Sequence, residues 1–569
     1  MSEKKKIKLT EEERAERFKH CLEEATQWHD EKRTFWDEMY DVYEGNVDMP
    51  ENIRSLMQSD VRVPWAYQQV ETIIPRILDP DPRFEFNPVE KNDKQMSDLL
   101  NAIIRWQLKS DQFIRKQRGI ILDACVKGIA GVKVVWRRTE KEALVKSKKG
   151  IKDRLTGNDP GFERKCLIVE NRPEVLPLDM NDVFPDPAAT TDSELRYVLH
   201  RLWLTKRDLK EREANGEISG VEDACATYDD STVRHGESGA EAEARRKNRY
   251  PVFEGWWDDG TRMMMLGNTV LFDGDNPYAH LSIPFLFFSS QPKSTSLVGT
   301  SEVEKIRSIQ EAVWVRQNQS IEATNMALCM VLIADPTIRN FSNLKVRPGA
   351  VIPANMGQRL DQLRIDPMSA PAYSEIESLL AAMQHVTGAS PYLAGSDPSQ
   401  MGVNQDTATG SMILQEEGNK RMNLKSLEYK LFLSRIAKQM VQLNSQFLSQ
   451  FEVNQIVDSE LDGLWKPPST TDIPMFLDVI PEAMNEQMTK TNQRQSLVEL
   501  MNIMNPMHMA PMHDGSQFSI KAIMEQTLKE YDQEPNASFP PAPPPPPMME
   551  GPDGSQGTAP TGEPAPPSG

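Results

Sequence analysis

The chain has 569 residues, of which 38% are hydrophobic and 26% charged, and a formal net charge of −19 at pH 7. This length exceeds what one hydrophobic core supports and predicts about two to four domains. The acidic balance argues against general coating of nucleic acid, because such coating requires a basic face that displaces counterions.

No segment of the sequence indicates secretion or a membrane span. The N-terminal stretch MSEKKKIKLTEEERAERF has no apolar core of a signal peptide, and the apolar run Met326–Ala334 is too short to cross a bilayer. The 5 cysteines include no CxxC pair, which favours reduced thiols in a cytosolic setting. We therefore expect a soluble protein with no membrane partner.

The first part of the chain predicts helices. Thr10 and Glu13 have capping-box spacing and begin a helix over 10–45. Further helical patterns cover 61–78 and 93–127, and the glycines at 128–131 end the last of them.

Strand patterns follow. The runs GVKVVWRR, ERKCLIVE and EVLPL predict a small mixed sheet, and the basic stretch over 139–161 predicts a solvated loop. VLHRLWLTKRDLKER predicts a strand that leads into a helix, and residues 210–248 are polar enough to predict a mobile insertion. YPVFEGWWD and RMMMLGNTVLFDG predict two arms of a hairpin, with Gly267-Asn268 as a nearby turn. Residues 1–298 are therefore expected to be an α+β region.

The second half of the chain is predicted to be mostly helical. Ser301 and Glu304 have capping-box spacing at the start of the first of these helices. The expected segments are a helix over 299–334, a β-rich part over 335–371, a helix over 372–387, a loop over 388–407, a long helix over 408–451, a helical part over 452–534 and a Pro-rich tail over 535–569. The long helix would extend about 60 Å at 1.5 Å per residue. The tail is expected to be disordered or extended.

The loop and the start of the long helix lack positive charge. Between Thr387 and Asn419 there are four acidic residues and no lysine or arginine, although lysine and arginine supply 65 of the 569 residues. Such a window arises by chance in a few per cent of cases, so the pattern supports, without proving, a surface that does not hold a polyanion.

Motifs for catalysis or metal binding are absent from the sequence. There is no GxGxxG, Walker A, HExxH, paired CxxC or GxSxG pattern. His508 and His513 have neither i,i+3 nor i,i+4 spacing and are expected to lie in a polar loop. We therefore expect no catalytic residue, no cofactor and no metal.

Basic residues gather in the predicted β-rich part. They are Arg339, Lys345, Arg347, Arg359 and Arg364. They are consistent with a contact patch for phosphates or an acidic protein partner. A solvated surface with Asp361 and Asp366 nearby is an equally good interpretation.

The order of these parts resembles the portal proteins of tailed bacteriophages, in particular short-tailed phages. GTSEVEKIRSIQEAVWVRQNQ is similar to the entry of the first stem helix, and VRPGAVI to the clip. SLLAAMQHVTGASPYLAG is similar to the second stem helix running into the tunnel loop, and TATGSMILQEEGNKRM to the start of the long helix. NDVFPDPAATTDSELRYVLHRLWLTKRDLKER resembles the wing. The likeness covers about residues 20–530.

The resemblance implies an α+β, predominantly helical fold with wing, stem, clip and crown. The wing would be 1–298 together with the long helix 408–451, the stem helices 299–334 and 372–387, the clip 335–371, the tunnel loop 388–407 and the crown 452–534. The tunnel-loop residues expected to line a DNA channel are Ser396, Asp397, Gln400, Asn404, Gln405 and Asp406. The basic residues of the clip would bind a partner.

The resemblance also implies a dodecameric ring at one capsid vertex of the virion, assembled in the host cytoplasm. Double-stranded DNA would be packaged and ejected through its channel. The expected partners are further copies of the chain, the terminase large subunit, a head–tail adaptor, and the major capsid and scaffolding proteins. The alternatives are another virion structural protein, such as an adaptor or scaffold, and a metal-dependent hydrolase that uses scattered acidic residues.

Overall fold

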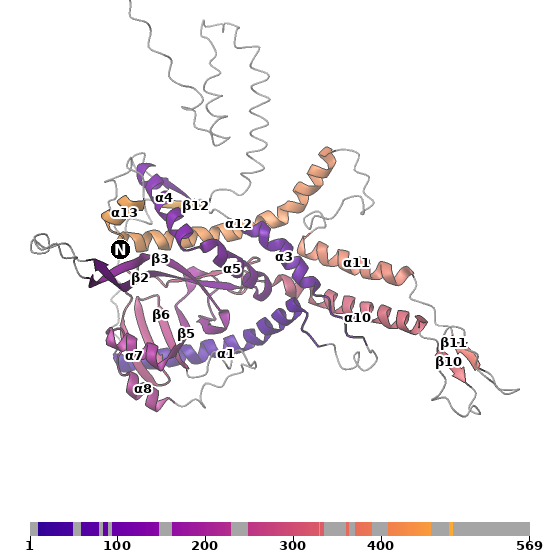
Figure 1. Ribbon diagram of the computed structural model, residues 1–569, viewed down its shortest axis with the longest axis horizontal. Helices are drawn as coiled ribbons and strands as arrows, with labels where there is room; N and C mark the ends of the chain where they lie inside the picture. The colour runs from indigo at the N-terminus through magenta and orange to yellow at the C-terminus, as the bar shows by residue number, and fades with distance from the viewer. Residues whose placement is uncertain are drawn as a thin grey trace, which may run out of the picture. The chain divides into compact units, whose positions relative to one another are not determined.

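The structure is a computed structural model that mixes helices with antiparallel sheets, in agreement with the predicted α+β class (Figure 1). All described residues belong to one compact unit, Met1–Glu482, and a second unit covers Ala483–Gly569. The described residues are 10–48, 59–78, 84–88, 94–146, 162–228, 249–328, 331–334, 360–363, 370–389, 408–456 and 477–481.

Helix α1 (Glu11–Glu44) confirms the capping box in the sequence. The backbone N–H of Thr10 donates to Glu13 Oε2 at 2.7 Å, and the N–H of Glu13 donates to Thr10 Oγ1 at 3.4 Å. The helix ends at Gly45, whose φ of 81° is readily available to glycine.

The helix predicted over 93–127 is two helices, α4 (Lys94–Ser110) and α5 (Phe113–Lys127). The break falls at Asp111 and Gln112, where Gln112 has a φ of 50°. The Asp111 carboxylate accepts a hydrogen bond from Lys116 at 2.7 Å and lies 3.4 Å from the backbone N of Val175. The contact with Val175 of the neighbouring sheet is a tertiary interaction that the local helical pattern does not reveal. The preceding helix, α3 (Trp65–Ile77), starts after Pro64, later than expected.

The first sheet has three antiparallel strands in the order β3 (Phe162–Leu178), β2 (Ala130–Lys146) and β9 (Phe285–Phe288). The prediction of a mixed sheet is wrong, because all strand pairs are antiparallel. The predicted loop is wrong for 139–146, where β2 continues, and residues 147–161 lie outside the described residues. The runs ERKCLIVE and EVLPL also form one strand. Cross-strand ion pairs stabilise the polar part of the β2–β3 pair. Arg137 and Glu170 are one example, with charged atoms 2.9 Å apart.

The second sheet has five antiparallel strands in sequence order. They are β4 (Val183–Pro185), β5 (Tyr197–Thr205), β6 (Arg249–Trp257), β7 (Thr261–Leu266) and β8 (Thr269–Asp275). The predicted hairpin is therefore three strands, since Gly267, with a φ of 58°, turns the chain between β7 and β8. Short 3-10 turns, η2 (Met180–Asp182) and η3 (Asp192–Glu194), flank β4.

The prediction of a mobile polar insertion is wrong for residues 210–228. They contain most of α7 (Lys206–Ala214) and all of α8 (Val221–Thr227). Leu209, Ile218 and Val221 are buried in a small apolar cluster against the five-stranded sheet. The sparse apolar residues of this stretch are thus spaced to cover one sheet face. Residues 229–248 lie outside the described residues.

The second half contains the expected helix pair and long helix. Its elements are α10 (Glu302–Leu328), β10 (Val331–Ala334), β11 (Leu360–Leu363), α11 (Ala370–Thr387), α12 (Ala408–Phe447) and α13 (Gln450–Ile456). The helix expected to reach residue 334 ends at Leu328, because the chain pairs as β10 with β11. The predicted helical part over 452–534 contains a strand, β12 (Leu477–Pro481), which pairs with β1 (Phe84–Pro88).

The largest apolar cluster joins α1, α3, α4, α5 and the three-stranded sheet to α12. Tyr429 and Phe432 of α12 pack on Phe288 of β9, with ring centroids 5.1 and 5.3 Å apart. Gln107 of α4 and Asn444 of α12 exchange two buried side-chain hydrogen bonds of 2.7 and 2.9 Å. Among the described residues, no helix is long and apolar enough to cross a membrane.

One buried ion pair joins the two sheets of the first half. Lys133 of β2 and Glu254 of β6 form an ion pair of 2.6 Å with side chains 9% and 3% exposed. Burial opposes ionisation of Glu254, but Lys133 and Arg262 hold its pKa at about 2. Burial lowers the pKa of His200 to about 4, with Lys133 acting in the same direction.

Buried histidines make the free energy of unfolding depend on pH. Burial lowers the pKa values of His29, His200 and His280 from 6.5 to about 4, so each contributes stability above pH 6.5 that is lost as pH falls toward 4. Asp192 acts in the opposite direction, because burial raises its pKa from 3.8 to about 6. Burial also raises the pKa values of Asp37, Asp41, Asp111, Asp123 and Asp273, so the contribution of one histidine is isolated by comparing a variant with the wild type.

Relative to the wild type, His200→Phe should gain up to about 3 kcal/mol of unfolding free energy as the pH falls from 6.5 to 4, because the folded state then no longer excludes one proton. Urea unfolding at a series of pH values measures it. His20→Phe is the control, since His20 is exposed on α1. A His200→Phe profile parallel to the wild type would contradict the assignment.

Candidate functional site

The residues predicted to line a channel and to bind a partner lie outside the described residues. This set is Ser396, Asp397, Gln400, Asn404, Gln405 and Asp406 of the loop, and Arg339, Lys345, Arg347, Arg359 and Arg364 of the β-rich part. Their roles stay predictions. The structure describes the elements from which both segments leave and to which they return.

The β-rich part is closed at its base by a strand pair. β10 and β11 are antiparallel, with Val331 opposite Leu363 and Ala334 opposite Leu360. β10 follows the C-terminus of α10, and β11 precedes the N-terminus of α11. The ladder therefore brings Ala334 and Leu360 together, so the segment 335–359 leaves and returns at the same place. The two helices lie side by side (Figure 1), and Arg316 of α10 forms an ion pair of 3.1 Å with Glu375 of α11.

Two cations of α12 hold the other end of α11. Arg421 donates to the carbonyl of His385 at 3.0 Å, and Lys425 donates to the carbonyl of Thr387 at 3.2 Å. Cations at a helix C-terminus complement its unpaired carbonyls. Gly388 follows with a φ of 77°, and Ala389 is 3% exposed. The chain up to Ala389, from which the segment 390–407 leaves, is therefore held against α12.

Lys425 also forms a buried ion pair. Its ammonium lies 2.7 Å from Oε1 of Glu302, and the side chains of Lys425 and Glu302 are 6% and 0% exposed. Gln291 donates to the same oxygen at 2.5 Å. Because Glu302 begins α10, one lysine side chain joins the start of α10, the end of α11 and the middle of α12.

The start of α10 is fixed to α5 as well. Ser301 donates to the carbonyl of Val126 at 2.6 Å, and its oxygen accepts from the N–H of Glu304 at 3.2 Å. Gly128 has a φ of 81°, and a Cβ there would lie 2.8 Å from the carbonyl oxygen of Gly299. Only glycine fits this close approach. The predicted cap of this helix is thus confirmed on its Ser301 side.

Together these contacts form a joint of four helices, defined here by Ser301, Glu302, Thr387, Arg421 and Lys425. Its cations bind backbone carbonyls and one carboxylate, and these contacts fix the helices relative to one another. Sequence reasoning missed Lys425 and Glu302, because a charged residue in a helix is usually solvated. The described residues contain no group of three or more histidine, cysteine, aspartate or glutamate side chains placed to hold a metal.

The opposite face of α12 exposes a leucine stripe, defined as Leu424, Leu427 and Leu431. These side chains are 62%, 48% and 44% exposed. Their spacing places them on one side of the helix, turned away from the buried Tyr429, Phe432 and Ile436. The long helix thus has two apolar faces, of which only one is covered within the described chain.

Comparison with protein families gives a match over residues 162–551 to the model of the phage SU10 portal protein. The match covers more than half of the chain and includes both stem-like helices and α12. The chain belongs to this portal protein family. No curated protein matched it.

Membership in a portal family has coarse consequences. Such a family is structural and not enzymatic. It implies an oligomeric ring that associates with the capsid, at the capsid vertex of a virion. The resemblance to tailed-phage portal proteins noted in the sequence is confirmed.

The Lys425–Glu302 pair predicts that removing one charge lowers the free energy of unfolding more than removing both. Lys425→Met should destabilise the protein by about 3 kcal/mol, because it leaves the buried Glu302 carboxylate without its cation. Adding Glu302→Leu should recover much of this loss, since the buried charge is then gone. Urea unfolding of the single and double variants measures the coupling.

The matched control is Arg316→Met with Glu375→Leu, an ion pair whose side chains are 43% and 49% exposed. Its coupling should be below about 1 kcal/mol. Equal coupling energies for the two pairs would show that Lys425 has no special structural role.

Proposed function

We propose that the chain forms the channel ring at a phage capsid vertex, through which double-stranded DNA is packaged and later ejected. The observation that carries this proposal is the portal-family match over residues 162–551 together with the paired helices α10 and α11. The match favours a portal over the adaptor, scaffold and hydrolase alternatives. Terminase would supply the motor.

The segment 388–407 is proposed as the tunnel loop; its residues 390–407 lie outside the described residues. Its support is the absence of lysine and arginine between Thr387 and Asn419. Each phosphate contact by a cation releases counterions and adds attraction, which would resist the passage of duplex DNA. Ser396, Asp397, Gln400, Asn404, Gln405 and Asp406 would face the DNA. The joint at Lys425 would hold the loop at a fixed distance from the channel axis.

We assign the remaining parts by the same reasoning. α10 and α11 serve as the stem, and the segment beyond β10 and β11 as the clip. The clip cations would contact the terminase large subunit or a head–tail adaptor; they are Arg339, Lys345, Arg347, Arg359 and Arg364. The two sheets with α1 and α12 form the wing, which meets capsid and scaffolding proteins, and the residues beyond 452 form the crown.

The leucine stripe is proposed as part of the contact between neighbouring subunits. An apolar surface left uncovered in one chain is typical of a protein contact site, and the exposed fractions of Leu424, Leu427 and Leu431 fit this description. Burial of one leucine contributes about 2 kcal/mol. A contact repeated around a ring would therefore depend strongly on these residues.

Purified protein should form rings with a central hole in negative-stain images, and a subunit number near twelve by native mass spectrometry. Changing Leu424, Leu427 and Leu431 together to serine should shift the protein toward monomers, because each ring contact loses apolar burial. Phe451→Ser is the control, since Phe451 is 72% exposed and outside the stripe. A wild-type protein that stays a single globule would contradict the ring itself.

Deletion of Ser396–Asp406 should leave ring assembly intact and impair DNA packaging or retention, because the channel loses the tunnel loop that is proposed to line it. Particle assembly with quantification of packaged DNA measures this. A Gly/Ser linker of equal length in place of these residues separates the effect of loop length from that of charge. Normal packaging by the deleted ring would show that the tunnel-loop assignment is wrong.

A further inference from the structure

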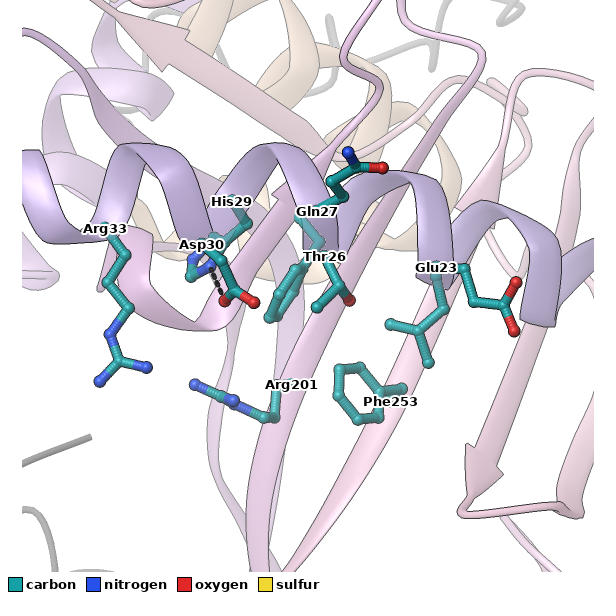
Figure 2. A pocket seen from close by; sticks show the side chains of 10 residues that line it. Glu23, Thr26, Gln27, His29, Asp30, Arg33, Arg201 and Phe253 are labelled. Atoms are coloured by element: carbon teal, nitrogen blue, oxygen red, sulfur yellow. Dashed lines mark ion pairs between the residues drawn. The ribbon is translucent and has the colours of Figure 1, made fainter. Parts of the chain in front are cut away.

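A pocket of about 540 Å³ lies between α1 and the strands β4, β5 and β6 (Figure 2). This volume is typical of small-molecule sites. The residues that line it are Leu22, Glu23, Thr26, Gln27, His29, Asp30, Arg33, Phe184, Arg201 and Phe253. Nothing in the portal role described above uses this pocket.

One wall of the pocket is apolar. Leu22 of α1, Phe184 of β4 and Phe253 of β6 contribute to it. The rings of Phe184 and Phe253 have centroids 5.7 Å apart in an edge-to-face arrangement. This wall suits an apolar or aromatic group.

Two buried guanidinium groups lie at the other side. The side chains of Arg33 and Arg201 are 10% and 8% exposed. Each has a carboxylate neighbour, because Asp37 is 3.8 Å from Arg33 Nε and Asp182 is 2.8 Å from Arg201 Nε. Burial still lowers the pKa of Arg33 below its ordinary value, and Arg201 acts in the same direction.

His29 presents a buried acceptor to the same space. It is 1% exposed, and its Nε2 is 3.0 Å from the carbonyl oxygen of Met180, so Nε2 carries the proton. Nδ1 is then a lone-pair acceptor, and it makes no hydrogen bond within the described residues. It lies 3.9 Å from Oδ1 of Asp30, a second acceptor (Figure 2). A donor placed beside both would satisfy them.

The lining charges therefore divide into two kinds. Asp30 and Glu23 are anionic, Arg33 and Arg201 are cationic, and burial lowers the pKa of His29 to about 4, which keeps it neutral near pH 7. A simple anion would meet Asp30, and a simple cation would meet the guanidinium groups. A ligand with both charges and an apolar body meets a complementary group at each end.

We propose that this pocket binds a free α-amino acid with an apolar, preferably aromatic, side chain. The ammonium group lies beside His29 Nδ1 and Asp30, and the carboxylate lies beside Arg33 and Arg201. The side chain packs on Leu22, Phe184 and Phe253. The proposal concerns the single chain and does not depend on ring formation.

Isothermal titration of the purified full chain with L-phenylalanine tests the proposal. Saturable binding is expected. Hydrocinnamate lacks the ammonium group and phenethylamine lacks the carboxylate, so each should bind at least about tenfold more weakly. Absence of saturable binding of L-phenylalanine at millimolar concentration, or equal affinity for all three compounds, would overturn the proposal.

Two variants place the binding in this pocket. Arg33→Gln removes one cation, and Thr26→Trp fills the pocket from α1 without removing a buried charge; each should weaken L-phenylalanine binding by about tenfold or more. Arg17→Gln is the matched control, because Arg17 is on the same helix and pairs with Asp259 at 2.6 Å outside the pocket. Circular dichroism verifies folding of each variant. If neither pocket variant changes the affinity for L-phenylalanine, the titration heat comes from another site and the proposal is rejected.

Discussion

The buried ion pair between Lys425 and Glu302 is the interaction on which the second half of the chain depends. The ammonium group lies 2.7 Å from the carboxylate and also donates to the carbonyl of Thr387. Taking both charges out of water is costly, so the pair is stable only while its partners stay in place. The start of α10, the end of α11 and the middle of α12 are therefore positioned together.

Helix α12 carries both the joint and the leucine stripe, so one helix links the position of the proposed tunnel loop to the proposed contact between subunits. The inner face of α12 packs Tyr429 and Phe432 on the core and holds α11 through Lys425, while its outer face exposes the leucine stripe. A subunit contact on that outer face would act on a rigid helix that also holds the base of the segment 390–407. Loop position and ring assembly would then be coupled without a separate hinge.

Local signals made much of the fold predictable. The capping box at Thr10 and the long apolar periodicity of α12 depend on residues close in sequence, and both were predicted from it. The break at Gln112 and the continuation of β2 to Lys146 were missed, because distant partners stabilise them. The charge pattern of the loop is visible in the sequence, but the pairing of Lys425 with Glu302 is not, since each resembles a solvated helix residue.

Three cations of α12 contact oxygen atoms of their own subunit. Arg421 donates to the carbonyl of His385, Lys425 pairs with Glu302, and Arg435 pairs with Asp192 and donates to the carbonyl of Phe287. Contact with protein oxygens fixes the position of each group, and the carboxylates of Glu302 and Asp192 offset the charges of Lys425 and Arg435, which weakens their attraction for a phosphate. Low adhesion would thus have two sources: residues 387–419 contain no lysine or arginine, and the charges of Lys425 and Arg435 are paired within the subunit.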